Sequence, residues 1–221
     1  MVTARRYTAM PGSGEATMTR TAEFFFDCSS PWTYIGFETL VAAAREDGFG
    51  VCFRPFLVGG VFNAVNTSVY AMRAAEANPK TAYFWKDLHD WIARSGLAIK
   101  WRPSIFPINS ARAMRCCLLA ADAGACEAFA RRVFQLYWGE DRDIADAGVL
   151  AEACAAAGLD AAAILDAADS PALKARLRAN TDEIIARGGF GTPTFYIGDD
   201  MYFGQDRIVL MREALRRAGA P

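Results

Sequence analysis

The hydrophobic pattern near the start of the chain predicts a strand and then a helix. Residues 22–28 (AEFFFDC) are apolar almost throughout and show no helical period, which is typical of a strand covered on both faces. Ser30 and Pro31 follow, a capping hydroxyl and a proline suited to the first position of a helix. This helix is expected to run to about Asp47 and to end at Gly48.

The next apolar run, residues 51–58 (VCFRPFLV), predicts a second strand that ends at Gly59 and Gly60. The short crossover between the two strands makes them a parallel pair. Residues 61–188 then show the alanine-rich pattern of helices, with Ser110 and Ser170 placed as N-caps. This pattern predicts a helical insertion of about half the chain.

The last segment predicts a hairpin and a helix. TFYIG and MYFG lie on either side of Asp199 and Asp200, and residues 206–219 have an amphipathic helical pattern. Strand, helix, strand, hairpin and helix is the order of a thioredoxin-like fold. The predicted class is therefore α/β: a thioredoxin-like domain (residues 21–60 and 189–221) with an inserted all-helical domain (61–188). Residues 1–20 lack apolar periodicity and are expected to form a loose leader.

Composition and charge exclude several classes of function. The 24 basic and 25 acidic residues give a net charge of -1, and no basic cluster stands beside a row of aromatics, so nucleic acid is not an expected partner. No apolar stretch reaches the roughly 20 residues of a membrane helix, so no membrane association is expected. The single histidine, His89, excludes a multi-histidine metal site, and its helical surroundings favour a surface position.

The six cysteines show no CxxC spacing, and we interpret them as the reduced thiols of a cytoplasmic protein. Cys28, in the first predicted strand, is expected to be a buried structural residue. A thiol oxidant acting through Cys28 or through the adjacent Cys116 and Cys117 is a minor alternative, because vicinal cysteines on a helix seldom form a disulfide.

Three loops carry candidate chemistry, and the first is DCSSPWTY. A helix N-terminus at the end of a parallel strand stabilises an anion, and redox members of this fold place a CxxC pair there. The corresponding residues here are Ser30 and Thr33, which cannot form a disulfide. Ser30 would instead donate a hydrogen bond to a thiolate that belongs to a ligand. The alternative is that Ser30 only caps the helix.

The other two loops are GTPTF and GQDR. A cis bond between Thr192 and Pro193 would expose the backbone of Thr192 to a peptide-like ligand, whereas a trans bond would make an ordinary turn. Gln205 and Asp206, at the start of the last helix, suit the carboxylate and ammonium of an amino acid, or they are simple caps. All three loops fall on one rim of the predicted sheet. Together they describe a groove for a small zwitterionic peptide with a thiol in its middle, which is glutathione.

Four segments carry a family resemblance: FFFDCSSPWTYIGFETL, FRPFLVGGVFNAVN, KTAYFWKDL and GGFGTPTFYIGDDMYFGQDRI. Together they resemble the 2-hydroxychromene-2-carboxylate isomerases and the kappa-class glutathione transferases, which share the fold of the DsbA-type disulfide oxidants. The resemblance extends from about residue 22 to the C-terminus. It implies a DsbA-like thioredoxin domain with a helical insertion, a homodimer, and a glutathione thiolate held by Ser30. LVGGVFNA and YFGQDR favour the isomerase branch, whereas GFETL favours the transferase branch.

The resemblance also implies which residues contact glutathione. They are Asn66, with Asn63 as the fallback, Lys80, Thr192 with the following Pro193, and Gln205 with Asp206, after which comes Arg207. A small, flat aromatic substrate would lie beside them. The candidates for its pocket are aromatic residues that could equally belong to the core: Trp32, Phe62, Tyr83, Trp85 and Trp101.

The predicted function is a glutathione-dependent cis-trans isomerase of 2-hydroxychromene-2-carboxylate, or of a similar intermediate of aromatic catabolism, that acts by reversible thiolate addition. One alternative is a kappa-class transferase or peroxidase, in which the same thiolate attacks an electrophile that is not released intact. Another is a glutathione- or peptide-binding module without turnover.

Overall fold

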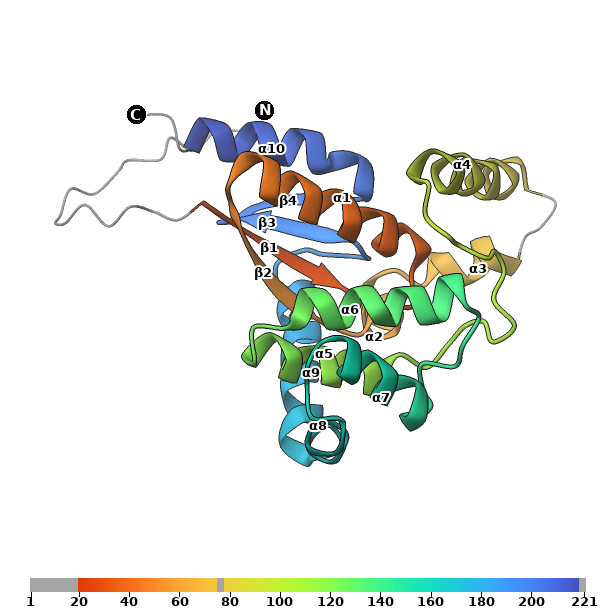
Figure 1. The fold of residues 1–221 in the computed structure, drawn as a ribbon. Coiled ribbons are helices and arrows are strands. Elements are labelled where there is room, and N and C mark those ends of the chain that lie inside the picture. Colours follow the sequence, from red (N-terminus) through yellow and green to blue (C-terminus); the bar gives the residue numbers. More distant parts are fainter. Residues whose placement is uncertain (1–19, 75–77, 219–221) are drawn as a thin grey trace, which may run out of the picture.

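A computed structural model describes residues 20–74 and 78–218 (Figure 1). The predicted leader lies outside the described residues apart from Arg20. The elements, in chain order, are β1 (Thr21–Phe26), α1 (Pro31–Asp47), β2 (Gly50–Pro55), α2 (Val58–Val65), α3 (Ser68–Ala74), α4 (Pro79–Ser95), α5 (Ala111–Asp122), α6 (Cys126–Phe134), the π-helix η1 (Gln135–Gly139), α7 (Ala147–Ala156), α8 (Ala161–Ala168), α9 (Pro171–Ala186), β3 (Thr194–Ile197), β4 (Asp200–Phe203), the 3-10 helix η2 (Gln205–Arg207) and α10 (Ile208–Ala218).

The four strands form one mixed sheet in the order β2-β1-β3-β4. β1 and β2 are parallel, as their short crossover predicts, while β3 runs antiparallel to β1 and pairs with β4 as the expected hairpin. Phe24 is opposite Phe53 on one neighbour and Phe195 on the other. The chain thus has the strand and helix order of a thioredoxin-like sheet, with helices α2 to α9 between β2 and β3.

The consecutive phenylalanines of β1 pack on opposite faces of the sheet, because side chains alternate along a strand. Phe24 and Phe26 belong to a core with α1, α5, α6 and α10, and the ring of Phe24 stacks on that of Phe195 at 5.2 Å. Phe25 packs on the other face with Tyr196, α2 and α9. Figure 1 shows α1 and α10 side by side on one side of the sheet, with α9 on the other. The strand is therefore covered on both faces, as predicted.

Helix α1 begins and ends where its sequence predicts. The Ser30 side chain accepts a hydrogen bond from the N–H of Thr33 at 3.3 Å, and Pro31 occupies the first helical position. At the other end Gly48 takes a left-handed conformation (φ 66°), which glycine adopts without steric cost.

The second strand ends earlier than predicted. It stops at Pro55, the partner of Phe26, and residues 58–65 form α2 instead of a strand end and a glycine turn. Proline has no N–H to continue the ladder. Val58 and Val61, which are spaced as on one face of a helix, then pack against Phe25. The prediction of strand through residue 58 was therefore wrong.

The two predicted serine caps differ. Ser170 caps α9 by accepting a hydrogen bond from the N–H of Leu173 at 3.3 Å. Ser110 occupies the N-cap position of α5 but makes no capping hydrogen bond with its side chain. Its side chain instead lowers the pKa of the nearby Asp27 carboxyl, so the prediction of an ordinary capping hydrogen bond was wrong there.

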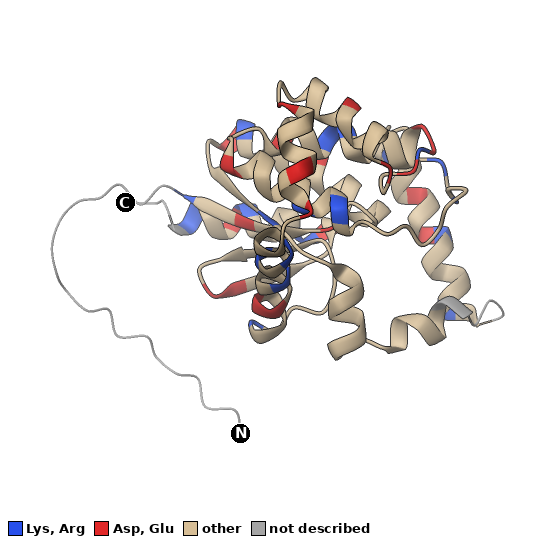
Figure 2. Ribbon diagram, turned by 90° about the horizontal axis from the view of Figure 1, so that it is seen from below, with Lys and Arg blue, Asp and Glu red and all other residues tan. Residues whose placement is uncertain are grey.

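Basic and acidic residues are interspersed over the fold (Figure 2), in agreement with the near-zero net charge. Many of the arginines pair with carboxylates, as Arg176 does with Asp122 and Arg131 with Glu38. Within residues 20–74 and 78–218, no helix combines the length and the apolar character that crossing a membrane requires.

Candidate active site

A cavity of about 850 Å³ opens beyond the C-terminal end of β1. The starts of α1, α2 and α5, one side of α4, the loop before α5 and the loop before β3 form its wall. Among the residues that line it are Asp27, Ser29, Ser30, Trp32, Val58, Gly59, Phe62, Asn66, Tyr70, Lys80, Phe84, Trp85, Leu88, Trp101, Phe106, Asn109, Ser110, Ala111, Phe190, Gly191, Thr192 and Phe203.

Ser30 lies half-buried at the start of α1, on the cavity wall. Its oxygen accepts the capping bond from Thr33, which occupies a lone pair and leaves the hydroxyl hydrogen available. Capping the helix and donating to an anion are therefore compatible roles for one hydroxyl. The free N–H groups of the first helical turn lie beside it and favour negative charge.

Thr33 connects this helix start to the loop before β3. Its hydroxyl forms a buried hydrogen bond of 2.8 Å with the hydroxyl of Thr192. The bond between Thr192 and Pro193 is cis, which decides between the two alternatives left open by the sequence and excludes the ordinary trans turn. Thr192 lines the cavity, whereas Pro193 lies behind it, against Gly36 of α1.

Asn66 and Lys80 line the same cavity as Ser30. Asn66 ends α2, and its side-chain amide donates to the carbonyl of Phe190 at 3.0 Å. Lys80 is exposed in the first turn of α4. Asn63, the fallback for Asn66, is outside the described cavity wall and accepts a hydrogen bond from the hydroxyl of Tyr70 at 2.8 Å.

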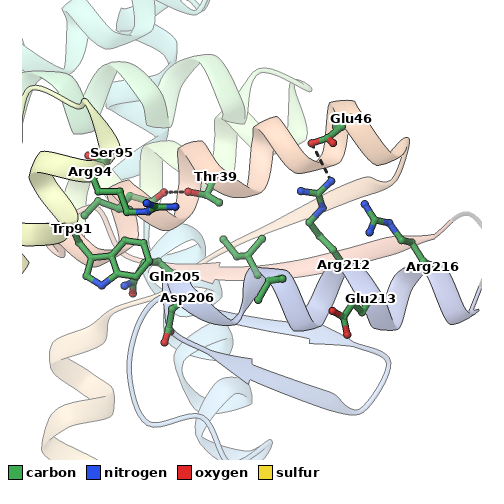
Figure 3. Close-up of a pocket in the computed structure, with 13 residues that line it drawn as sticks. Thr39, Glu46, Trp91, Arg94, Ser95, Gln205, Asp206, Arg212, Glu213 and Arg216 are labelled. Carbon is green, nitrogen blue, oxygen red and sulfur yellow. Dashed lines mark hydrogen bonds and ion pairs between the residues drawn. The ribbon is translucent and has the colours of Figure 1, made fainter. Parts of the chain in front are cut away.

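Gln205 and Asp206 line a second cavity, of about 580 Å³, between α1, α4 and α10 (Figure 3). Gln205 is only 9% exposed, and Asp206 forms an ion pair with Arg207 at 3.5 Å. The N-terminal half of α4 borders the first cavity and its C-terminal half, with Trp91 and Arg94, borders the second. The two cavities therefore follow one another along the α1 and α4 pair.

Aromatic rings form a connected wall of the first cavity. Trp85 packs against Phe84 at 4.8 Å and against Trp101 at 4.9 Å between ring centroids, Trp32 contacts Phe84, and Trp101 contacts Phe106. Such a wall suits a flat apolar ligand.

Of the aromatic residues that the sequence singled out, four line this cavity and one does not: Trp32, Phe62, Trp85 and Trp101 do, and Tyr83 does not. Tyr83 is 66% exposed because it lies on the solvent side of α4. Phe84 and Phe106 were missed. The helical spacing of Lys80, Phe84 and Leu88 is the signal that could have identified Phe84.

Asp27 is a third cavity residue that was not identified from the sequence. It is 1% exposed, directly follows β1 and lines the cavity floor. Burial raises the pKa of its carboxyl, while hydrogen bonds from Ser29, Val58 and Ser110 act in the opposite direction. Asp27 was missed because its neighbours in the sequence are apolar, and the whole segment was interpreted as a buried strand.

The cysteines are free, as predicted, and five of the six are buried. Cys28 packs in the core: its N–H faces the sulfur of Met114 at 3.4 Å and its carbonyl accepts from the indole of Trp138. Burial raises the pKa of the Cys28 thiol, raises that of Cys116 to about 12, and raises that of Cys117 well above its usual value. These thiols are therefore protonated and unsuited to thiol oxidation.

His89 is exposed on α4, as predicted, where its Nδ1 is 2.7 Å from the carbonyl oxygen of Trp85. No cluster of metal-binding side chains occurs in the part of the chain that the structure describes.

The residues of the first cavity suit a thiol-containing peptide. Ser30 has a hydrogen to donate, the helix N-terminus beside it favours an anion, and Lys80 supplies a positive charge. The residues predicted for the glutamyl end, Gln205 and Asp206, lie in the second cavity.

Comparison with known proteins identifies the class. A family described as "DSBA-like thioredoxin domain" matches residues 21–216, so the chain belongs to this family. The predicted fold class, a DsbA-like thioredoxin domain with a helical insertion, is thereby confirmed.

Three of the relatives are named as isomerases. A 2-hydroxychromene-2-carboxylate isomerase from Sphingobium xenophagum is 29% identical over 200 residues, covering 90% of this chain and 99% of that protein. Human glutathione S-transferase kappa 1 is 26% identical over 215 residues, covering 89% and 91%. A solved structure of 2-hydroxychromene-2-carboxylate isomerase superposes with a TM-score of 0.79 at 25% identity, covering 90% of this chain and 95% of that one. The resemblance seen in the sequence is thus confirmed.

Proposed function

We propose that the protein is a glutathione-dependent cis-trans isomerase of 2-hydroxychromene-2-carboxylate or a similar intermediate of aromatic catabolism. The observation that carries the proposal is the Ser30 hydroxyl, which caps α1 and still has a hydrogen to donate beside an aromatic-walled cavity. The relatives named 2-hydroxychromene-2-carboxylate isomerase support the choice of reaction.

The energetics of thiolate stabilisation suit this site. A free thiol with a pKa near 8.5 is only about 3% ionised at pH 7. Lowering that pKa by about two units requires about 2.7 kcal/mol in favour of the thiolate. One hydrogen bond to a charged acceptor contributes about 1.5–3 kcal/mol, and the helix N-terminus adds to it. Ser30 and the first turn of α1 are sufficient to keep a bound thiol ionised.

When bound, glutathione would supply a thiolate that adds reversibly to the double bond of the ring-opened substrate, allows rotation about the resulting single bond, and leaves unchanged. Ser30 would hold the sulfur by donating its hydroxyl hydrogen. Lys80 would bind the glycine carboxylate, and Asn66 and Thr192 would bind the peptide backbone. The aromatic wall, with Trp85 and Trp101, would hold the flat ring and exclude water.

The glutamyl end of glutathione would extend toward Gln205 and Asp206. The support for this path is that the two cavities border the same pair of helices in succession. Gln205 would hold the α-carboxylate and Asp206 the ammonium group.

The test is Ser30→Ala in the full chain. We expect kcat/KM for glutathione-dependent isomerisation of 2-hydroxychromene-2-carboxylate to fall about tenfold to a hundredfold, because a hydrogen bond to the thiolate of about 1.5–3 kcal/mol is lost while the helix N-terminus remains. Turnover is followed by the absorbance of the substrate at a fixed glutathione concentration. Unchanged turnover would refute the role of Ser30.

Ser170→Ala is the matched control. Ser170 caps α9 with the same hydrogen bond, a hydroxyl accepting from the third helical N–H at 3.3 Å, and lies outside both described cavities. Each variant loses one cap and is expected to lose about 1 kcal/mol of stability. Ser170→Ala should keep full activity, which separates the loss of the cap from the loss of the thiolate donor.

A kappa-class transferase or peroxidase is the second candidate, supported by the human relative. The glutathione concentration before and after turnover distinguishes the two. An isomerase leaves this concentration constant, whereas a transferase consumes one glutathione molecule per turnover. A binding module without catalysis would bind glutathione in calorimetry and turn over neither substrate.

We also propose that the chain acts in the cytoplasm as a homodimer. Sedimentation at several protein concentrations would test the dimer.

A further inference from the structure

Asp27 is a buried carboxylate for which the proposed chemistry has no task. It is 1% exposed and lines the same cavity as Ser30. Burying a carboxylate is unfavourable unless hydrogen bonds replace its lost hydration. The groups that donate these hydrogen bonds therefore identify which parts of the molecule the carboxylate holds together.

The groups around the Asp27 carboxylate come from three different helix starts. Asp27 Oδ1 accepts from the N–H of Ser29, just before α1, and Oδ2 accepts from the N–H of Val58, the first residue of α2, each at 2.9 Å. Ser110, at the N-cap position of α5, lies near enough for its side chain to lower the pKa of this carboxyl. One buried side chain thus lies at the beginnings of three helices that are far apart in the sequence.

Ser110 does not cap its own helix with its side chain. A serine at an N-cap usually accepts a hydrogen bond from its own helix, as Ser30 and Ser170 do. Ser110 makes no such bond, and its side chain instead lowers the pKa of the nearby Asp27 carboxyl. The start of α5 therefore lies beside the same buried carboxyl as the starts of α1 and α2.

All three helix starts border the cavity, through Ser30, Val58, Gly59, Ser110 and Ala111. The N–H groups of a first helical turn carry partial positive charge and stabilise an anion placed before them. How strongly they do so depends on their distance from the anion, and hence on the relative positions of the three helices.

We propose that Asp27 is a positioning residue of this site: it fixes the starts of α1, α2 and α5 relative to one another, and thereby the donors that surround a bound thiolate. The identity of that anion rests on the proposed function, whereas the tie between the three helices does not.

The negative charge of Asp27 would act in the opposite direction, because one anion disfavours another nearby. Asp27→Asn separates the two effects. The substitution keeps the size of the side chain, removes the charge, and places an NH₂ donor where one oxygen accepted an N–H. Loss of the charge alone would lower the pKa of a bound thiol, whereas displaced helix starts would raise it.

The experiment compares Asp27→Asn and Ser110→Ala with the unaltered full-length chain. Without any ligand, we expect amide hydrogen exchange at Ser29 and Val58 to be at least about tenfold faster in Asp27→Asn, since a lost hydrogen bond is equivalent to about 1.4 kcal/mol or more. With glutathione bound, the ultraviolet absorbance of the thiolate should report a thiol pKa about one unit higher in Asp27→Asn. The rise should be smaller in Ser110→Ala, which keeps the charge and the two backbone hydrogen bonds of Asp27.

Kinetics provide a further readout. We expect kcat to fall about tenfold in Asp27→Asn with little change in the KM for glutathione, because the donors are displaced while the peptide contacts remain. Asp160→Asn is the matched control: Asp160 accepts two backbone N–H bonds at the start of α8, at 2.9 and 3.2 Å, away from either described cavity. It should leave the thiol pKa and kcat unchanged.

A lower thiol pKa in Asp27→Asn, or unchanged exchange and thiol pKa in both variants, would overturn the proposal. If Asp27→Asn does not fold, Ser110→Ala carries the test with the same readouts. Absence of glutathione binding to the unaltered chain in calorimetry would overturn the proposed function and the thiolate part of this inference. The exchange rates at Ser29 and Val58 would still decide whether Asp27 joins the helices.

Discussion

A serine hydroxyl has one hydrogen to donate and two lone pairs that accept. In Ser30 one lone pair caps α1, which fixes the oxygen on the cavity wall. The same residue in a flexible loop would lose side-chain freedom each time it bound an anion. In the proposed function the cap would therefore pre-organise the donor.

Gly36 controls another contact at the residue scale. A Cβ at this position would lie 3.0 Å from Cγ of Pro193 and 3.4 Å from Cβ of Gln205, so a side chain here would require these neighbours to move by a few tenths of an ångström. We expect Gly36→Val to lower the free energy of unfolding by about 1–3 kcal/mol, because its methyl groups overpack this contact. Urea denaturation measures the change.

Gly59 provides the comparison for Gly36. It also lies in a helix, but a Cβ there would meet no atom within 4 Å. Gly59→Ala should therefore be neutral or stabilise the fold by up to about 1 kcal/mol, through helix propensity alone. Equal effects of Gly36→Val and Gly59→Ala would contradict the packing argument.

At the scale of elements, α1 is joined to α10 at the end remote from the cavity. Asp47, the last residue of α1, accepts hydrogen bonds from Arg212 at 2.5 and 2.9 Å and from Arg216 at 2.7 Å. These guanidinium groups hold the pKa of Asp47 well below its usual value. The interaction stabilises the pairing of the two helices on one side of the sheet (Figure 1).

This pairing predicts a pH dependence. Because the pKa of Asp47 is lower in the folded than in the unfolded chain, its contribution to stability is complete above the unfolded value of about 3.9 and is lost as the pH falls below it. The difference in Tm between the unaltered chain and Asp47→Asn should therefore be largest near neutral pH and should shrink between about pH 4 and pH 2. A difference that stays constant over this range would exclude the charged pairing as its cause.

Some elements could be predicted from sequence and others could not, for identifiable reasons. β1 and α1 combine a uniform apolar run, a cap, a proline and a terminal glycine, and these local signals agree with one another. The VCFRPFLV run gives only hydrophobicity, which does not distinguish a strand from a buried helix start; Pro55 was the better signal. Ser110 was misread because its partner, Asp27, is distant in the sequence.

At the scale of the whole molecule, the burial of the thiols disfavours a thiol oxidant. Cys52 is the one exposed cysteine, on the edge strand β2, and the other five are buried. We expect a thiol-specific reagent to modify one thiol rapidly in the native protein and the remaining five only in denaturant. Cys52→Ser should abolish the rapid reaction, and rapid modification of two or more thiols would refute this arrangement.

The candidate site could be predicted only in part, because its wall comes from segments that the fold brings together. Ser30 and Thr192 were accessible from sequence, since each belongs to a short motif with its own backbone requirement. The aromatic wall could be predicted only in part. Phe106 contacts Trp101, but it lies in a loop before α5, where the sequence has no helical or strand periodicity to indicate which way a residue faces. The division of the predicted glutathione contacts between two cavities depends on where α4 lies, which no motif specifies.

Ser30 and Thr33 carry hydroxyl groups at the two positions where redox members of the fold carry thiols, so this pair does not respond to the redox potential of its surroundings. Members of the same fold with sulfur at these positions exist in an oxidised and a reduced form, and the ambient redox potential decides which one is populated. Oxygen in a serine or threonine has no such second form. A change in surroundings that would switch a dithiol relative between two states leaves Ser30 and Thr33 chemically as they are.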